Sequence, residues 1–595
     1  MTEPAGFAST IPTTPSSPDP SSPKAKSSLR ALWETWTHRL FTMREDQFFL
    51  FLAVLIGIMS GLAVVCFRIA IEWTQIELLG SSLAPSTLRV ILAPTLGGLA
   101  VALLVIYAFP RSRGSGVNQT KSAVYVSNGY IPFNTVVGKF IVCALAIGSG
   151  QSLGPEDPSL QMGAGIASLI GRRLRLSQEK VRLIAPVGAA AGLAAAFNAP
   201  ISAVLFVLEE VIGTWSAGVL GAIVLGAISS VVTMRAFLGP ESMFRVPPFR
   251  VAKPVDLLAY IALGIVGGLA SLVFLKWLAY ARPRIQSLPK WTKYFQPAVA
   301  GLLIGLIGIR LPQVMGAGYP IIDQAMHGQF TWKLLLVLAA LKILATGFSF
   351  LSGTPGGMFA PALFIGAMLG GAVGAIEQHF FPGLPGTVGT FALVGMGTFF
   401  AGFLRVPITS VFMVIEVSGN YTAILPVMIS SLIAYGISRS YIKVPLFDML
   451  ARQDGLVLPS VEERREQLVL TVEDAMRLDA VVLEPNHNAA DAIKREEGKE
   501  NALFFLRVRP GEWNFVGRDE LERLAEDASR THTVSEANSK GPLPFVFRDM
   551  SLEEALHWAG DWPALPVLSR ADLSKLEGVI TLDDILRAFR KVPAE

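Results

Sequence analysis

Glu156 is the residue of this chain whose type and surroundings say most about chemistry. It stands in Gly-Pro-Glu-Asp-Pro at 154–158, just after the apolar stretch Val136–Gly148. A carboxyl group among membrane helices is costly unless it faces water, an ion path or a charged partner. Gly and Pro interrupt helices and free backbone N–H groups. The carboxylate of Glu156 could therefore compete with an anion for the same N–H groups, which makes this segment a candidate anion site.

Two other Gly-rich breaks are of the same kind. One is Gly-Ser-Gly-Val-Asn at 114–118, and the other is Gly-Gly-Met-Phe-Ala-Pro at 356–361. Each of the three breaks precedes a predicted helix, whose first N–H groups and positive dipole end would face the break. Glycine also lets the backbone approach an ion closely. Each break alone is common between membrane helices, but the three together predict an anion site made of converging helix ends.

The composition places most of the chain in a membrane. Of its 595 residues, 52% are hydrophobic and 16% are charged, whereas soluble domains have about 25% charged residues. The charged residues are concentrated in 1–47 and 451–595. The net charge of +4 reflects cytoplasmic lysines and arginines of a membrane protein, so we expect no nucleic-acid partner.

Enzyme chemistry is not indicated. The sequence has no metal-ligand cluster, nucleophile triad or phosphate-binding loop, and its six histidines are scattered. The two cysteines, Cys66 and Cys143, lie in apolar stretches, where buried thiols are expected. We therefore predict that the chain is not an enzyme, holds no metal and requires no cofactor.

A series of apolar segments must position the three breaks. A helix needs about 20 residues to span a bilayer, and several segments here are shorter or are interrupted by Gly and Pro. Short and broken helices are typical of transporter sites, so we predict an all-α polytopic membrane protein. The segments are 47–72, 88–109, 133–150, 184–212, 216–238, 255–281, 293–309, 332–350, 358–377, 388–402, 407–418 and 422–441.

The apolar region contains an internal repeat. Residues 198–209 resemble 405–416, with Pro200 and Glu209 matching Pro407 and Glu416. Two similar halves of about 200 residues are typical of repeat transporters, whose ion site lies where the halves meet. The sequence leaves open whether the second half is inverted. For Glu209 and Glu416 we expect structural pairing or helix capping.

The chain is predicted to have three parts. Residues 1–46 are a disordered cytoplasmic segment without the apolar stretch of a secretory signal, and 47–452 form the membrane domain. Residues 453–595 form a soluble α/β module, and we expect both termini to be cytoplasmic. In the module, short apolar runs alternate with amphipathic helices: Ala502–Leu506, Pro566–Leu568 and Gly578–Ile580 are runs, and Ala489–Arg495, Leu552–Ala559 and Leu582–Lys591 are helices.

The three breaks, together with Ala-Phe-Asn-Ala-Pro at 196–200 and the pair Glu209-Glu210, resemble the ClC family of chloride channels and chloride/proton antiporters. The likeness covers roughly 47–452. It implies a repeat fold with broken helices, chloride and protons as transported partners, and a homodimer in the lipid bilayer. Which membrane would hold it is left open.

The resemblance assigns residues to an anion path. Ser115 matches the family's central serine, whose hydroxyl would donate to the anion, and Gly116 lies beside it. Glu156 matches the gating glutamate. Phe359 and Ala360 match the third motif, whose backbone amides would face the ion.

Two further residues match positions outside the three breaks. Glu210 matches the internal proton glutamate of the proton-coupled exchangers. Lys139 resembles a lysine that would raise the positive potential near the central site, and a snorkelling or paired lysine is the alternative interpretation.

The chain departs from the family pattern at three places. Asn118 replaces the proline of the first motif, so the choice among anions is open. The second motif has Pro155 and Asp157 around the glutamate. The position of a tyrosine that supplies a hydroxyl is occupied by Phe447. Because phenylalanine cannot donate a hydrogen bond, Ser115 would be the only matched side-chain hydroxyl at the central site.

The favoured function is chloride/proton antiport. Protonation would neutralise Glu156 and let it swing away to admit chloride, and Glu210 would relay the proton through water. A passive chloride channel of the same fold is the first alternative, which Phe447 and the altered second motif favour. An ion-sensing membrane scaffold with little flux is the second. The coupling ratio is not indicated by the sequence.

The C-terminal module resembles a pair of CBS domains. The first would cover about 470–524 and the second about 547–588, which carries Gly-Val-Ile-Thr-Leu-Asp-Asp at 578–584. In CBS pairs that bind nucleotides, the residues matching Thr581 and Asp584 touch phosphate and ribose. The first repeat lacks matching residues, so a dimerisation module without ligand and an adenine-nucleotide site both stay open.

Overall fold

The computed structural model describes residues 45–80, 86–213, 217–241, 243–244, 257–380, 387–456, 458, 470–494, 503–526, 532–570 and 572–591. The chain divides into two compact units, Met1–Leu458 and Pro459–Glu595. The predicted segment 1–46 lies almost wholly outside the described residues, so its disorder stays a prediction.

The first unit is built from helices in two successive sets. The first set is α2 (Glu45–Leu79), α3 (Thr87–Leu103), η1 (Leu104–Ala108), η2 (Pro110–Ser112), α4 (Gly116–Val126), α5 (Phe133–Gly148), α6 (Glu156–Arg173), α7 (Gln178–Phe197), α8 (Pro200–Phe206), η3 (Val207–Ile212) and α9 (Ala217–Leu238). The second set is α10 (Leu257–Gln286), η5 (Lys290–Tyr294), α11 (Gln296–Gly308), η6 (Pro312–Val314), α12 (Tyr319–Met326), α13 (Trp332–Leu351), α14 (Phe359–Phe380), α15 (Val388–Leu404), α16 (Pro407–Ser418), η7 (Tyr421–Ala423), α17 (Ile424–Tyr441) and α18 (Leu446–Gln453).

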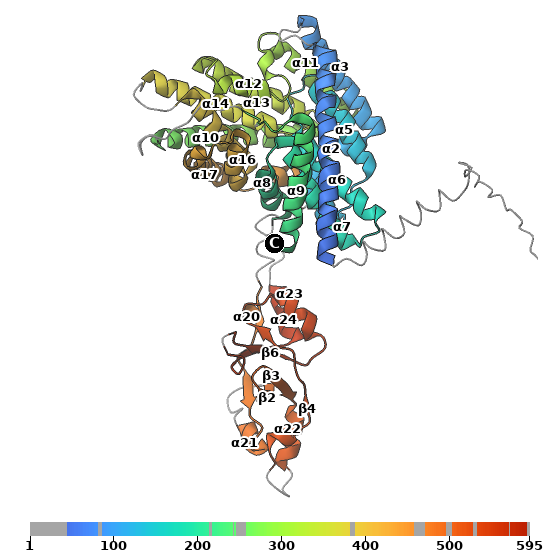
Figure 1. Cartoon of the computed structure of the whole chain (residues 1–595), viewed down its shortest axis with the longest axis vertical. Coiled ribbons are helices and arrows are strands. Elements are labelled where there is room, and N and C mark those ends of the chain that lie inside the picture. Colours follow the sequence, from blue (N-terminus) through green and yellow to red (C-terminus); the bar gives the residue numbers. More distant parts are fainter. Residues whose placement is uncertain are drawn as a thin grey trace, which may run out of the picture. The chain divides into compact units, whose positions relative to one another are not determined.

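The prediction of a polytopic helical membrane protein is confirmed. Among the described residues, eight helices are long and apolar enough to cross a membrane, and four shorter apolar helices accompany them. Helices that are distant in sequence pack together, as α2 and α9 do in Figure 1. Apolar side chains of both sets form one continuous core.

One predicted apolar segment is divided into separate helices. Residues 184–212 are not a single helix, because α7 ends at Phe197 and α8 begins at Pro200. Asn198 between them has φ of 56°, a left-handed conformation that ends a helix. Proline is favoured at the first position of a helix, so Pro200 starts the new one. Arg405, with φ of 67°, ends α15 before Pro407 in the same way.

The two helix sets meet through reciprocal contacts, as an approximate two-fold arrangement requires. Gly154 donates its N–H to the carbonyl of Gly357 at 2.7 Å, and Gly357 donates to Gly154 at 2.8 Å. The Glu209 carboxylate accepts from the N–H of Thr409 at the start of α16. The Glu416 carboxylate accepts from the N–H of Ser202 at the start of α8. The expected capping role of both glutamates is thus confirmed.

Small residues allow the core helices to approach closely. A Cβ atom on Gly163 of α6 would clash with the carbonyl oxygen of Gly188 on α7. The same clash would occur between Gly366 of α14 and Gly395 of α15. Close backbone approach at small residues is a common way for membrane helices to associate. It fixes α6 and α14, which carry the second and third Gly-rich breaks at their N-termini.

The second unit contains two small sheets with the same order of elements. In the first, β1 (Ala480–Leu483) pairs in parallel with β2 (Leu503–Arg509), which pairs antiparallel with β3 (Glu512–Val516). In the second, β5 (Val546–Phe547) pairs in parallel with β6 (Leu565–Leu568), which pairs antiparallel with β7 (Leu576–Ile580). The remaining elements are β4 (Ser539–Lys540), which pairs with β3, and the helices α20 (Val472–Ala475), α21 (Ala489–Lys494), α22 (Arg518–Glu526), η8 (Val534–Glu536), α23 (Leu552–Ala559) and α24 (Leu582–Lys591).

Candidate functional site

The three Gly-rich breaks lie together, as the sequence predicted. Helices α4, α6 and α14 begin at Gly116, Glu156 and Phe359, which are residues of the three breaks. The reciprocal backbone pair between Gly154 and Gly357 joins the second and third breaks. Three helix N-termini, with their N–H groups and positive dipole ends, therefore meet near the contact between the two helix sets.

Glu156 lies at this meeting point. Its side chain is fully buried, and it lies beside its own N–H and that of Ala360. The hydroxyl of Tyr319 donates a hydrogen bond to Oε1 of Glu156. A Cβ atom on Gly154 would clash with Oε2, which explains why glycine stands there. The carboxylate thus sits at the N–H groups where an anion would bind, as expected for a gate.

Asp157 holds a second carboxylate against the first break. Its Oδ1 accepts a hydrogen bond from the N–H of Val117 at 2.7 Å, and its Oδ2 accepts from the hydroxyl of Ser115 at 3.0 Å. The Ser115 hydroxyl, which we expected to donate to an anion, is therefore directed to a carboxylate here. Its role toward chloride stays a prediction, and so does that of the Gly116 amide.

Lys139 lies behind the first break. Its ammonium group is fully buried and donates to the carbonyls of Ser112 and Gly114 at 3.0 and 2.7 Å. Among the described residues, Lys139 forms no ion pair within 4 Å. Its positive charge nevertheless interacts favourably with the carboxylate of Asp157. The buried position excludes a snorkelling lysine, and the effect of Lys139 on the potential at an anion site stays a prediction.

The second helix set repeats this arrangement. The ammonium group of Lys342 is also fully buried, and it donates to the carbonyls of Val314 and Gly316 at 2.9 and 2.7 Å. These carbonyls precede Tyr319, just as Ser112 and Gly114 precede α4. Sequence reasoning missed both Lys342 and Tyr319. The match of Gly-Ala-Gly-Tyr at 316–319 to Gly-Ser-Gly-Val at 114–117 is the signal that could have found them.

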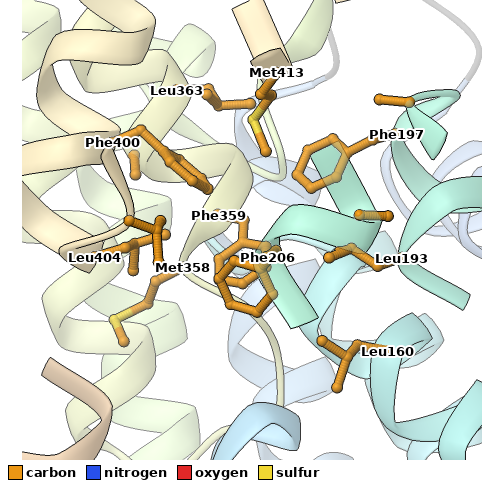
Figure 2. Close-up of a cluster of buried hydrophobic side chains, with 14 of the residues drawn as sticks. Leu160, Leu193, Phe197, Phe206, Met358, Phe359, Leu363, Phe400, Leu404 and Met413 are labelled. Atoms are coloured by element: carbon orange, nitrogen blue, oxygen red, sulfur yellow. The ribbon is translucent and has the colours of Figure 1, made fainter. Parts of the chain in front are cut away.

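Aromatic rings enclose the centre of the site. Figure 2 shows Phe206, Phe197 and Phe400 around Phe359. The ring of Phe447 lies 6.2 Å from that of Phe359 and 6.4 Å from that of Phe206, measured between centroids. The site therefore has an apolar wall at Phe447, and the expected correspondence of this position to a tyrosine stays a prediction.

A cavity of about 420 Å³ leads to the first break. Ser115 and Asn118 line it, together with Arg111, Arg113 and Arg282. A cleft with several arginines raises the local concentration of anions. Asp454 also lines the cavity and pairs with Arg282 at 2.9 Å, so Arg111 and Arg113 provide its excess positive charge. The sequence did not reveal the cavity because these arginines come from separate segments.

Glu210 lies in η3, at the end of the helix that carries Phe206. It is 2% exposed, as a proton site inside the protein would be. Its Oε1 is 2.7 Å from the ammonium group of Lys121, which also pairs with Asp448. Sequence reasoning assigned Glu210 from the family pattern and missed Lys121, because no local pattern links residues 89 positions apart.

Thr581 and Asp584 in the second unit bind each other. Oδ2 of Asp584 accepts from the N–H and hydroxyl of Thr581 at 3.0 and 2.6 Å, at the start of α24. Arg477 also binds Oδ2 at 3.1 Å. The two side chains act here as a helix cap, and a nucleotide would have to replace these bonds. Adenine-nucleotide binding stays a prediction.

Comparisons with known proteins agree with this geometry. The model of the voltage gated chloride channel family matches residues 97–439. A putative chloride channel protein ClcB-like of Ralstonia nicotianae is 32% identical over 400 residues, covering 64% of this chain and 92% of its own. The H(+)/Cl(-) exchange transporter ClcA of Vibrio campbellii is 32% identical over 415 residues, covering 67% and 88%.

Solved structures share the fold. A slow cyanobacterial Cl-/H+ antiporter superposes with a TM-score of 0.64 at 24% identity, over 69% of this chain and 99% of its own. A eukaryotic CLC transporter superposes with a TM-score of 0.59 at 19% identity, over 90% of this chain and 97% of its own.

Proposed function

Because this chain belongs to the voltage gated chloride channel family, we propose that it exchanges chloride for protons across a membrane. The observation that carries the proposal is a pair of buried carboxylates, Glu156 and Glu210. The helix segments that carry them both lie next to Phe359. Glu156 lies beside the Ala360 N–H next to that ring. Glu210 follows Phe206, whose ring centroid is 5.0 Å from that of Phe359. The exchange transporters among the relatives support the same assignment.

Glu156 is the gate in this mechanism. When ionised, its carboxylate fills the anion position at the N-termini of α6 and α14 and excludes chloride. Protonation removes the charge that holds it at these N–H groups, so the side chain leaves and chloride enters. Because the same group binds the proton and blocks the anion, movement of one ion requires movement of the other.

The anion and proton use different inner routes. Chloride enters through the arginine-lined cavity that reaches Ser115. The proton enters at Glu210 and passes to Glu156 through water beside the apolar wall of Phe206 and Phe447. Separate routes that end on one carboxylate prevent an open path for either ion alone.

A passive chloride channel is the second candidate. It is favoured by Phe447, which provides no hydroxyl to hold chloride at the centre, and by the likeness to a putative chloride channel protein. A passive channel needs no internal carboxylate for protons, which is why the buried position of Glu210 favours exchange.

Replacing Glu156 by Ala tests the gate. We expect E156A in liposomes to carry chloride down its gradient without any proton movement, because the shared carboxylate is gone. Chloride efflux and external pH are recorded together, and Glu77→Gln, an exposed change on α2, is the matched control. Proton pumping that persists in E156A would contradict the mechanism.

We also propose that the second unit is a pair of CBS domains and that the chain forms a homodimer. The repeated order of strands and helices in its two sheets supports a CBS pair, and the resemblance to the ClC family supports a homodimer with cytoplasmic termini. The mass of the purified chain in detergent, measured by light scattering, tests the dimer, and a monomeric mass would contradict it.

A further inference from the structure

A stripe of polar side chains runs along α13 inside the membrane unit. Lys342, Thr346 and Ser349 follow one another at intervals of four and three residues, which places them on one face of a helix. All three side chains are fully buried. Buried polar groups are unfavourable unless they are hydrogen-bonded, so the partners of this polar stripe indicate its role.

At one end of the polar stripe, Lys342 holds the turn that leads into α12. Its Nζ donates to the carbonyl oxygens of Val314 and Gly316 at 2.9 and 2.7 Å. A Cβ atom on Gly318 would lie 3.4 Å from the same Nζ, so the ammonium group packs against the residue that precedes Tyr319. Because α12 begins at Tyr319, Lys342 fixes the backbone from which the tyrosine side chain extends.

At the other end, Thr346 and Ser349 hold the segment that leads into α6. The hydroxyl groups of Thr346 and Ser152 lie 3.0 Å apart. Oγ of Ser349 accepts from the N–H of Ser152 at 3.1 Å and donates to Oε1 of Gln151 at 2.8 Å. Glu156 begins α6 four residues after Ser152. The same helix face therefore fixes the backbone that leads to the gating carboxylate.

The two segments that the polar stripe holds also contact each other. Gly316 donates its N–H to the carbonyl of Gly150 at 3.2 Å, one residue before Gln151. The segments meet again where the hydroxyl of Tyr319 donates to Oε1 of Glu156. The polar stripe and these contacts form a closed network, so the position of one segment determines that of the other.

From this geometry we infer that the polar stripe of α13 positions the gate, because it keeps the Tyr319 hydroxyl within reach of the ionised carboxylate of Glu156. The inference rests on the proposed exchange mechanism, in which that carboxylate and chloride compete for one position, and it extends the mechanism to α13. The bond from Tyr319 favours the carboxylate in this competition. Lys342 and Ser349 act through the backbone of the two segments and are positioning residues.

The test measures the initial rate of chloride flux at a series of chloride concentrations, in liposomes containing the full chain. Lys342→Met releases the turn before α12, and Ser349→Ala releases the segment before α6. In both variants we expect the chloride concentration for half-maximal flux to fall several-fold while the maximal flux is kept, since a carboxylate without its hydrogen bond competes less well with chloride. Lys333→Met, at the exposed start of α13, is the control and keeps the half-maximal concentration of the unchanged chain.

Ser349→Ala leaves every charge in place and so separates positioning from an effect of the ammonium charge. A fall of the half-maximal concentration in Lys342→Met alone would overturn the inference in favour of that charge. Double variants test the partners of the polar stripe. When Tyr319→Phe or Glu156→Ala is already present, Lys342→Met should cause no further fall, because the bond between the two side chains is already absent.

A merely structural stripe would lower the maximal flux in every background and leave the half-maximal concentration unchanged. That result would overturn the inference alone, and so would failure of both Lys342→Met and Ser349→Ala to fold. A further fall in the double variants would show that the stripe does not act through Tyr319 and Glu156, and would also overturn it. Proton movement is recorded in parallel, and an unchanged chain that moves chloride without protons would overturn exchange and this inference together.

Discussion

Glu156 and Asp157 are adjacent residues at the start of α6, and their carboxylates contact the N-termini of different helices. Glu156 lies at the N-termini of α6 and α14, where Tyr319 donates to it. Asp157 lies at the N-terminus of α4 and accepts from Val117 and Ser115. Charge-assisted hydrogen bonds of this kind are about twice as strong as neutral ones. At the scale of residues, the two carboxylates therefore occupy the N–H groups at which we propose that an anion binds.

Tyr319 is expected to hold the gate closed. A hydrogen bond to a charged group contributes about 1.5–3 kcal/mol, so Tyr319→Phe destabilises the seated, ionised carboxylate of Glu156. We expect the initial rate of chloride efflux from liposomes to rise several-fold at neutral pH. Tyr107→Phe, whose hydroxyl faces Tyr294, is the control. An efflux rate equal to that of the unchanged chain would show that Tyr319 does not act on the gate.

At the scale of elements, the starts of the helices explain how the site is built. Helices α4, α6 and α14 begin at the three breaks, and α8 and α16 are held by carboxylates from the opposite helix set. Glu209 binds both the N–H and the hydroxyl of Thr409 at 2.8 and 2.5 Å, and Glu416 binds Ser202 in the same way. Glu209 and Glu416 thus each cap a helix of the opposite set, and these contacts connect the two halves of the membrane unit next to the site.

The caps predict equal losses of stability in the two halves. A carboxylate at a helix N-terminus contributes about 0.5–2 kcal/mol through capping and the helix dipole. We expect Glu209→Gln and Glu416→Gln each to lower the melting temperature by a few degrees and by similar amounts, measured by thermal unfolding in detergent. Glu77→Gln on the exposed side of α2 is the control. A large loss in only one of the two would contradict the reciprocal arrangement.

Some of these elements could be predicted from the sequence, and others could not. The Gly-rich breaks, the repeat and the helices Leu552–Ala559 and Leu582–Lys591 were predictable, because motif and periodicity are local signals. The division of 184–212 at Asn198 was missed because its left-handed turn leaves the apolar pattern unbroken. Tyr319 was missed because it lies 163 positions from its partner on the short helix α12. Lys121 was missed because a lone lysine gives no sign of the two carboxylates that fold against it.

At the scale of the whole molecule, the membrane unit places buried cations in equivalent positions of its two halves. Lys139 and Lys342 each donate to two carbonyls that precede a short helix, α4 or α12. We propose that these lysines and the arginines that line the cavity attract an anion toward the site, and that the buried carboxylates provide the coupling to protons.

The central claim is that chloride and protons move together through this molecule. The most direct measurement uses vesicles with equal chloride concentrations on both sides and a pH difference across the membrane. Exchange predicts that the pH difference alone drives a net movement of chloride, and that the movement disappears when Glu156 is replaced by Ala. Absence of any chloride movement under the pH difference, in a preparation that carries chloride down a chloride gradient, would contradict exchange and identify a channel.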